Sequence, residues 1–407
     1  ALVVGPAAWH HGWARDDWDA LAGAVVAGHV IECGPQATGG NYAFFTEVSG
    51  LDHPGFPIAE VAADGSSVIT KHPGHGGQVS VGTVTAQLLY EIGGPQYLNP
   101  DVTARFDSIR LTQDGPDRVR IDGVRGDSPP ATAKVALNYE GGYRTTTTLY
   151  LAGLDIEAKA ALVEQALWQE VDRDSFASVD VQLLRTDQVD PPSNEAAVAQ
   201  LRITVKDADE RKVGRAFSAK VTELGLSSYP GLFGGGPAAA QAYGVYWPAL
   251  VPAELVWQEV VVDGKRSVVD PVLPPTPPVV ATVPPIPAAA LPTEPCTRAP
   301  LGRVAGARSG DKGGNANLGV WARTDPAYAW LEATLTVDRL KALLPETAPL
   351  EVRRYELPNL RALNFVIVGL LGEGVAASTR LDGQAKSLGE YLRAKHLDIP
   401  DSLLEQS

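Results

Sequence analysis

The sequence has no methionine and only two cysteines in its 407 residues. Cys33 and Cys296 stand far apart, outside any CxxC or Cys/His spacing. This gives no support to a disulfide framework or a zinc site and is typical of a reducing compartment. No apolar run approaches the roughly 18 residues that a membrane helix needs, and no basic signal sequence opens the chain. We therefore expect a soluble, cytoplasmic protein.

Positive charge is also scarce. The chain carries 34 lysines and arginines against 48 aspartates and glutamates, a net charge of −14. Such an acidic balance argues against nucleic acid or an anionic membrane as the main partner. The missing methionine includes the initiator, and residues 1–6 resemble the end of an element already under way. We expect that a natural N-terminal segment precedes Ala1.

The composition, 44% hydrophobic and 20% charged, is that of a globular protein. Its length predicts two or three domains. We expect an α/β region at 1–143, a ferredoxin-like region at 144–268, a proline-rich linker at 269–300 and a small α+β domain at 301–407. The fold class is therefore mixed α/β and α+β.

In the first region, helical spacing predicts a helix from about 16 to 28. The apolar pair Val30-Ile31 is interpreted as a buried strand. A β-branched strand at 67–70 and a helix at 83–92 follow, the latter ended by Gly93-Gly94-Pro95.

The second region is predicted to follow the β-α-β-β-α-β order of the split ferredoxin-like arrangement. Its strands are placed at 145–151, 179–184, 201–205 and 256–262, and its helices at 155–167 and 210–226.

Residues 271–300 hold eleven prolines, which favour an extended linker without strand donors. Beyond the linker, strands are expected at 302–308, 317–323, 352–357 and 364–371, and helices at 337–344 and 384–395.

Three stretches combine glycines with acids, bases and amides, at residues 32–41, 71–77 and 308–317. Glycine allows tight turns and close approach, and polar groups beside it are common in ligand sites. The alternative is that each stretch is a structural turn whose polar side chains satisfy local backbone groups.

The first two stretches supply the candidate catalytic residues. His72 is a candidate general base near neutral pH, with Glu32 as its partner and His75 beside it. Lys71 is a candidate for holding an anionic substrate. The two histidines and Glu32 have the residue types of a metal site, but we assign no metal.

The third stretch could cradle a phosphate or carboxylate with its backbone amides and Lys312. It has neither the Walker nor the Rossmann order of glycines. The competing interpretation is a tight connection between two strands. The candidate substrate-binding residues of the three stretches are Gln36, Thr38, Asn41, Lys71, Arg308, Asp311, Lys312, Asn315 and Asn317.

Several longer motifs resemble the acyclic terpene utilisation family, AtuA, in that family's order along nearly the whole chain. They lie at residues 32–34, 36, 38–41, 71–74, 97–102, 114–119, 243–250 and 308–317. The resemblance implies a ferredoxin-fold module at the C-terminus and an α/β segment before Ala1.

The resemblance also implies a role in citronellol and geraniol catabolism, beside enzymes that process branched acyl-CoA thioesters, including a biotin-dependent carboxylase. Members of the family have been described as dehydrogenases, but this sequence has no nicotinamide-binding fingerprint. The sequence therefore identifies no cofactor.

We hypothesise hydration or isomerisation of a branched acyl or acyl-CoA compound, as in an acyl-CoA hydratase- or isomerase-like lyase. The alternative is a non-catalytic subunit or scaffold of an acyl-CoA carboxylase or hydratase complex. The expected partners are the small-molecule substrate, further copies of the chain and, in the alternative, carboxylase subunits.

Overall fold

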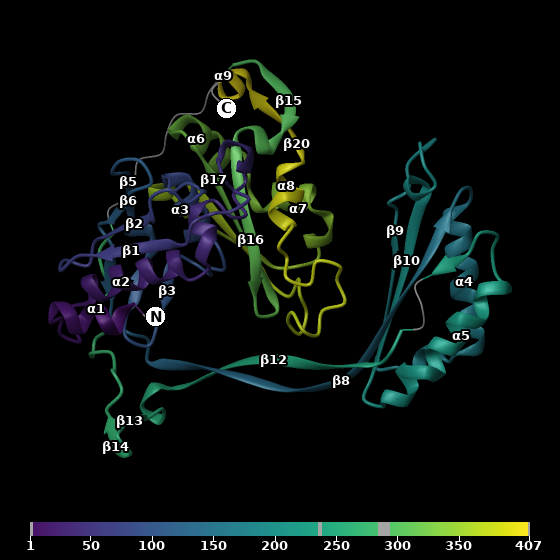
Figure 1. Cartoon of the computed structure of the whole chain (residues 1–407), viewed down its shortest axis with the longest axis horizontal. Coiled ribbons are helices and arrows are strands. Elements are labelled where there is room, and N and C mark those ends of the chain that lie inside the picture. The colour runs from purple at the N-terminus through teal and green to yellow at the C-terminus, as the bar shows by residue number, and fades with distance from the viewer. Residues whose placement is uncertain (1–2, 235–237, 284–293, 406–407) are drawn as a thin grey trace. The chain divides into compact units, whose positions relative to one another are not determined.

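The computed structural model describes residues 3–234, 238–283 and 294–405 (Figure 1). Packing divides the chain into two units. Unit 1 comprises residues 1–136, 248–375 and 384–407, and unit 2 comprises 137–247 and 376–383. The domain limits given above were inferred from the sequence alone, and they remain predictions. No helix among the described residues is both long and apolar enough to cross a membrane.

The N-terminal part of unit 1 packs three helices against two small antiparallel sheets. The helices are α1 (Val4–His11), α2 (Trp18–Ile31) and α3 (Val81–Leu88). One sheet has the order β1-β2-β6-β5, with β1 (Pro57–Val61), β2 (Ser67–Lys71), β5 (Arg110–Gln113) and β6 (Val119–Asp122). The other has the order β3-β4-β7, with β3 (Gln96–Leu98), β4 (Thr103–Arg105) and β7 (Arg125–Asp127).

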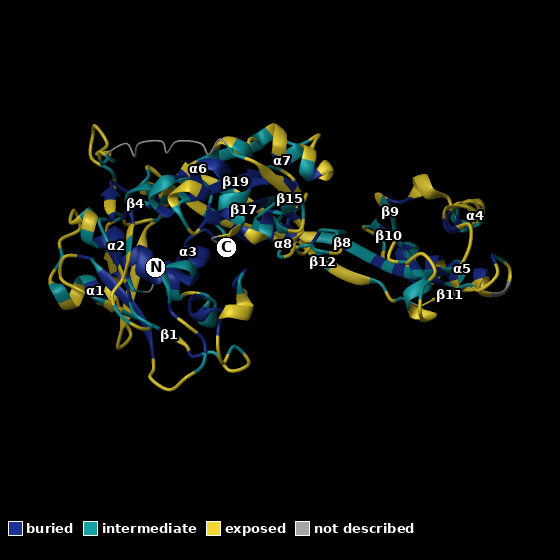
Figure 2. Cartoon of the chain, turned by 90° about the horizontal axis from the view of Figure 1, so that it is seen from above, coloured by how far each residue is buried: buried dark blue, intermediate teal, exposed yellow. Residues whose placement is uncertain are grey.

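The predicted strand at Val30-Ile31 is wrong, because both residues belong to α2. Every residue of α2 from Leu21 to Val30 is buried, so the helix is covered on nearly all sides (Figure 2). A short apolar run at the end of such a helix cannot be told from a buried strand by periodicity. The stretch at 32–41 therefore follows a helix end.

The C-terminal part of unit 1 is a four-stranded antiparallel sheet with helices on one face. The sheet order is β16-β17-β19-β18, with β16 (Ala305–Lys312), β17 (Asn315–Ala322), β18 (Val352–Leu357) and β19 (Ala362–Ile367). Its helices are α6 (Asp325–Thr334), α7 (Val337–Leu343) and α8 (Leu388–Arg393), followed by α9 (Asp401–Glu405). The sequence analysis missed α6, although Thr324 caps it and Pro326 stands in its first turn.

Unit 2 contains the predicted β-α-β-β-α-β order. Its sheet has the order β11-β8-β10-β9, with β12 also paired to β8. The elements are β8 (Thr132–Ala152), α4 (Ile156–Glu170), β9 (Ser178–Leu184), β10 (Val198–Asp207), α5 (Phe217–Glu223), β11 (Phe233–Gly234) and β12 (Gln241–Pro252). Two strands joined by a helix, β8 and β9, flank β10, which is the split arrangement. The α+β prediction with a ferredoxin-like region is confirmed.

The strand predicted at 256–262 does not belong to the sheet of unit 2. It forms β13 (Gln258–Val262), which pairs with β14 (Lys265–Val269) in a separate hairpin. Residues 376–383 instead lie on the sheet of unit 2, where Arg202 Nη1 donates to the Thr379 carbonyl at 2.6 Å.

The C-terminal sheet has the same arrangement of strands as the sheet of unit 2, but its edge strand comes first in the chain instead of last. Strands β17 and β18, joined by α6 and α7, flank β19, and the chain enters the sheet at β16. The two ends of the domain pair as β15 (Cys296–Pro300) and β20 (His396–Pro400). The last five residues of the predicted linker are therefore a strand, and part of the linker, 284–293, lies outside the described residues.

The two faces of the C-terminal sheet have different neighbours. Leu318, Val320 and Phe365 point into the core that α6, α7 and α8 cover. Trp321 and Ala362, on the other face, join the core of the N-terminal part. The sheet therefore connects the two cores of unit 1.

Two glycines allow this second face to approach the end of α3. A Cβ atom on Gly319 would lie 2.5 Å from Leu89 Cβ, and one on Gly310 would lie 2.7 Å from the Tyr90 ring. A larger residue at Gly319 would displace Leu89, and one at Gly310 would displace the Tyr90 ring.

We expect Gly319→Ala to lower the free energy of unfolding by about 1–3 kcal/mol, the usual cost of overpacking. Urea denaturation measures this change. Gly93→Ala is the matched control, because a Cβ there meets no atom within 4 Å. Equal stability of the two variants would contradict the close packing of β17 on α3.

Candidate functional site

The stretch at 32–41 leaves α2 and forms a short 3-10 helix, Gly34–Thr38. Thr38 is fully buried, and its hydroxyl donates to the carbonyls of Gly55 at 2.6 Å and Pro35 at 3.0 Å. These bonds fix the turn, so Thr38 has a structural role. Asn41 and Glu32 are exposed, and Gln36 is half-buried.

The stretch at 71–77 follows β2. Lys71 is buried, and its ammonium group donates to the His75 carbonyl at 2.7 Å and pairs with Asp117 at 3.0 Å. Its charge is thus already neutralised. His72 and His75 are exposed, with ring centroids 5.9 Å apart.

The first and second stretches do meet, but through the backbone. The Gln78 amide donates to the Thr38 carbonyl at 2.8 Å. Within the described part of the chain, no hydrogen bond or ion pair joins either histidine to Glu32. The predicted catalytic pairing of His72 with Glu32 stays a prediction without such a contact.

The stretch at 308–317 is a β-hairpin formed by β16 and β17, not a loop. The tight connection between strands, weighed above as the competing interpretation, is correct for its backbone. Arg308, Gly310 and Lys312 alternate onto the face that meets α3, whereas Asp311 lies on the other side of the strand. Asn315 accepts a hydrogen bond from the Gly369 amide at 2.9 Å.

Polar side chains of the hairpin cap the chain where α3 ends. Glu91 has a positive φ of 56°, its amide donates to Asn317 Oδ1 at 2.7 Å, and its carbonyl accepts from Lys312 Nζ at 2.8 Å. Asn317 also bonds to Asn364, which donates to the Gly93 carbonyl. Lys312 and Asn317 thus satisfy backbone groups of the turn that follows α3.

Arg308 carries the contact between the first and third stretches. Its Nε donates to Gln36 Oε1 at 3.1 Å, Nη2 donates to the same oxygen, and the guanidinium stacks 4.3 Å from the Tyr90 ring centroid. Only 8% of Arg308 is exposed, and this burial lowers the pKa of the guanidinium. Among the described residues, no carboxylate lies within ion-pair distance of it.

Three residues that the sequence analysis did not name complete the surroundings of Arg308. Lys386 pairs with Glu91 Oε1 at 2.8 Å and bonds to the Tyr90 hydroxyl. Tyr90 and Glu91 lie within three residues of the helix-ending Gly93-Gly94, and this position was a usable signal. Lys386 lies outside all three stretches and had no signal in the sequence.

Two further groups near this position are half-buried, and their pKa values are raised. Burial raises the pKa of the Cys33 thiol, so it is not a thiolate nucleophile at neutral pH. Burial, together with the charges of Glu32 and Glu91, raises the pKa of Tyr97 to about 12. We refer to Glu32, Cys33, Gln36, Tyr90, Glu91, Tyr97, Arg308 and Lys312 as the Arg308 cluster.

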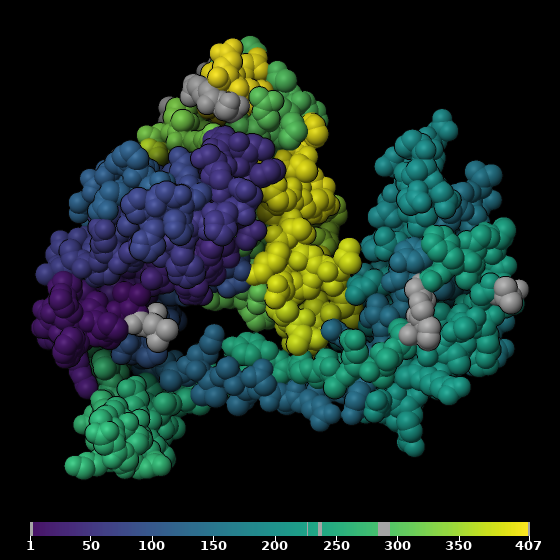
Figure 3. All heavy atoms as spheres, viewed as in Figure 1, coloured from purple at the N-terminus to yellow at the C-terminus, as the bar shows by residue number. Residues whose placement is uncertain are grey.

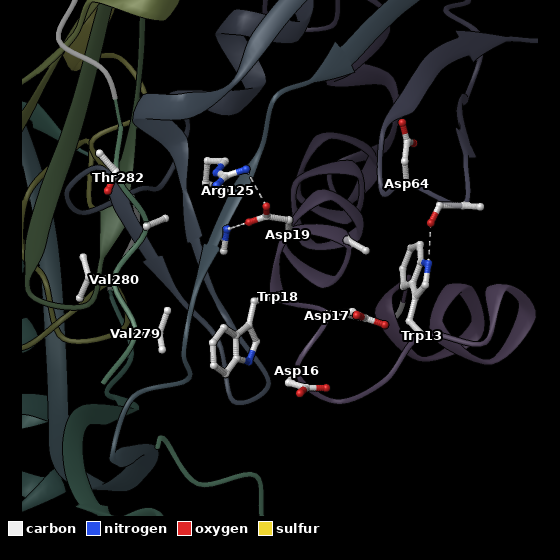
Figure 4. A pocket seen from close by; sticks show the side chains of 14 residues that line it. Trp13, Asp16, Asp17, Trp18, Asp19, Asp64, Arg125, Val279, Val280 and Thr282 are labelled. Atoms are coloured by element: carbon white, nitrogen blue, oxygen red, sulfur yellow. Dashed lines mark hydrogen bonds and ion pairs between the residues drawn. The ribbon is translucent and has the colours of Figure 1, made fainter. Parts of the chain in front are cut away.

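A separate hollow of about 690 Å³ lies in unit 1 between α2, β7 and residues 279–282 (Figure 4). Its acids are exposed or already used, because Asp19 pairs with Arg125 at 2.9 Å and accepts from the Gly126 amide at 2.8 Å. It contains no residue of the Arg308 cluster. In the described ranges, no group of three or more His, Cys, Asp or Glu residues is placed to hold a metal ion.

Comparison with known protein families gives two matches, which together cover the motifs that resemble the AtuA family. The model of the acyclic terpene utilisation family protein AtuA matches residues 1–262, and that of the AtuA ferredoxin-like domain matches 299–398. The chain belongs to the AtuA family. Neither a curated protein nor a solved structure matches it. Family membership places this AtuA protein in acyclic terpene utilisation.

The buried His29 of this AtuA protein should make the free energy of unfolding depend on pH. Burial, and next the charge of Lys312, lower its pKa from 6.5 to about 4. Between these values the unfolded chain binds a proton that the folded chain does not. The free energy of unfolding should therefore fall by up to about 3 kcal/mol as pH drops from 6.5 to 4.

Denaturant titrations across this range measure the effect. His29→Gln should flatten the slope, whereas the exposed control His72→Gln should leave it unchanged. A slope that survives in His29→Gln would assign the pH dependence to other groups.

Proposed function

We propose that the protein catalyses an acid/base step, hydration or isomerisation, on a branched acyl compound of acyclic terpene breakdown, with the Arg308 cluster as its site. The observation that carries this proposal is the buried Arg308 guanidinium, which has no carboxylate partner among the residues that the structure describes. Burying a charge is costly unless it is paired. An anionic group on the substrate would complete the pairing.

The geometry of Arg308 supports this role. The edge formed by Nε and Nη2 is occupied by Gln36, whereas Nη1 makes no hydrogen bond with any described residue. The other edge, formed by Nη1 and Nη2, therefore keeps hydrogen-bonding capacity for a carboxylate or a developing enolate oxygen. Arginine binds such groups through two parallel hydrogen bonds. Gln36 and the Tyr90 ring would hold the guanidinium in position.

Glu32 is the candidate proton acceptor. It is exposed and makes no hydrogen bond or ion pair with the described residues, so its carboxylate is available to substrate. Its charge acts on Tyr97, Lys312 and Cys33, and this supports its assignment to the cluster. In an isomerisation, Glu32 would remove a proton from one carbon and return it to another. In a hydration, it would take the proton from the attacking water and deliver it to the other carbon of the double bond.

Lys312 has a supporting role in this proposal. Its ammonium group already bonds to the Glu91 carbonyl, where the negative end of α3 offsets its charge. It would add positive potential rather than a direct bond to substrate. The resemblance supplies the acyl-CoA form of the substrate, and the free acid is the other form to be tested.

We expect Arg308→Gln to weaken binding of the substrate by about ten- to a hundredfold, the worth of lost charge-assisted hydrogen bonds. Thermal shift with branched acyclic acids and their CoA thioesters would identify the ligand and measure this loss. Arg323→Gln is the matched control, because Arg323 also stacks on a ring, Phe44, but pairs with Glu47. Unchanged affinity in Arg308→Gln would remove the cluster as the anion site.

Glu32→Gln should lower kcat by about 10²–10⁴-fold with little change in substrate affinity, because the amide keeps the shape but cannot accept the proton. Steady-state turnover on the ligand found above measures this split. His72→Gln, assayed in parallel, tests the competing base. A large loss in His72→Gln with normal turnover in Glu32→Gln would exchange their roles.

The second candidate is a non-catalytic subunit of an acyl-CoA carboxylase or hydratase complex. It is favoured by exposed apolar residues on β12, where Trp247 and Leu250 are 60% and 70% exposed. Pull-down from cells grown on citronellol separates the two candidates. A stable complex whose activity survives both Arg308→Gln and Glu32→Gln would support the subunit.

A further inference from the structure

The hairpin of β13 and β14 is bonded to no other described strand. Asp263 and Gly264, with φ of 50° and 75°, join its strands in the left-handed two-residue turn that suits a hairpin. It projects from unit 1 below α1 (Figure 3). Nine of its ten strand residues are exposed.

Four of these nine exposed residues are valines, and the exposed Trp257 directly precedes β13. Trp257 is 76% exposed, Val261 54%, Val262 62% and Val268 68%. An isolated two-stranded hairpin is only marginally stable in water, and a contiguous apolar patch on a soluble protein usually marks an interface. Unit 1 holds the hairpin mainly at its base, where Arg15 Nη1 donates to the Asp270 carbonyl at 3.3 Å.

The register shows which backbone groups point outward. Val262 pairs with Lys265 across the two-residue turn, and such a closing pair exchanges hydrogen bonds. The pattern then alternates along the strands. Val260 therefore bonds inward to β14, whereas the amides and carbonyls of Glu259 and Val261 point away from it.

The two outer edges differ in charge. Lys265 and Arg266 lie on β14, and lysine or arginine on an edge strand opposes further pairing. β13 carries three consecutive valines and one acid, Glu259, which pairs with Arg266 at 2.7 Å within the hairpin. The β13 edge is thus the unprotected one.

We propose that β13 pairs with β13 of a second copy of this chain, antiparallel about a two-fold axis at Val260. Glu259 of each copy then lies opposite Val261 of the other, and these are the residues with outward backbone groups. The two hairpins form one four-stranded sheet with the lysines and arginines on its outer strands. No like charges stand directly opposite each other. Such self-complementary pairing is the common form of a homodimer.

The test is sedimentation equilibrium of the full chain over a range of concentrations. The unmodified protein should sediment at twice the mass of one chain. Val261→Pro removes an outward donor without removing a bond inside the hairpin, and should give a monomer. Val268→Pro makes the same change on the outer edge of β14 and should remain dimeric.

Hydrogen exchange gives a second readout that does not depend on a substitution. The Glu259 and Val261 amides should exchange more slowly at high protein concentration than at low, whereas the Arg266 and Val268 amides should not. A monomer at all concentrations, or dissociation by Val268→Pro but not by Val261→Pro, would overturn the proposal. Neither substitution touches the Arg308 cluster, so failure here leaves the proposed function standing.

Discussion

The end of α3 lies against the glycine-bearing face of the C-terminal sheet, and the rest of unit 1 depends on this contact. Gly310 and Gly319 admit Leu89 and Tyr90, and Asn317 and Lys312 satisfy the backbone of Glu91. Steric fit and hydrogen-bond satisfaction therefore act at the same place. Together they fix the distance between two parts of the chain that are more than 200 residues apart in sequence.

The same contact positions Arg308. Strand β16 runs past the end of α3, so the side chain two residues before Gly310 reaches Gln36 in the turn after α2. The Tyr90 ring, in the turn that follows α3, covers one face of the guanidinium. A cation is thus withdrawn from water by residues whose own positions are set by packing. This is why its unmet charge is informative, whereas an exposed arginine would not be.

Much of the architecture could be predicted from the sequence. The α3 stop, the β-α-β-β-α-β order of unit 2 and strand Val352–Leu357 all have local signals in turn residues and periodicity. The end of α2 did not, because a helix buried on all sides has no amphipathic pattern. The pairing of β13 with β14 did have a local signal, because Asp263-Gly264 separates two short runs of β-branched residues, and the sequence analysis did not use it.

The site shows a similar division. Composition correctly marks 32–41 and 308–317 as places where polar groups meet backbone, and Gln36 and Arg308 do bond to each other. It could not distinguish groups that hold the fold from groups left for a ligand. Thr38, Lys71 and Asn317 have the residue types of a binding site, yet each is already bonded inside the protein. That distinction is set by three-dimensional neighbours.

The strand order shared by unit 2 and the C-terminal domain bears on how the chain folds during synthesis. In the C-terminal domain the chain enters at β16, so the helix α8 that packs on β16 is made about 80 residues after it. Strand β15 likewise cannot pair until its partner β20, about 100 residues later, has been synthesised. The strand that carries Arg308 therefore acquires its full set of neighbours only after α8, at Leu388–Arg393, has been synthesised. A ribosome-bound chain would hold the N-terminal half of the site before it holds the cation.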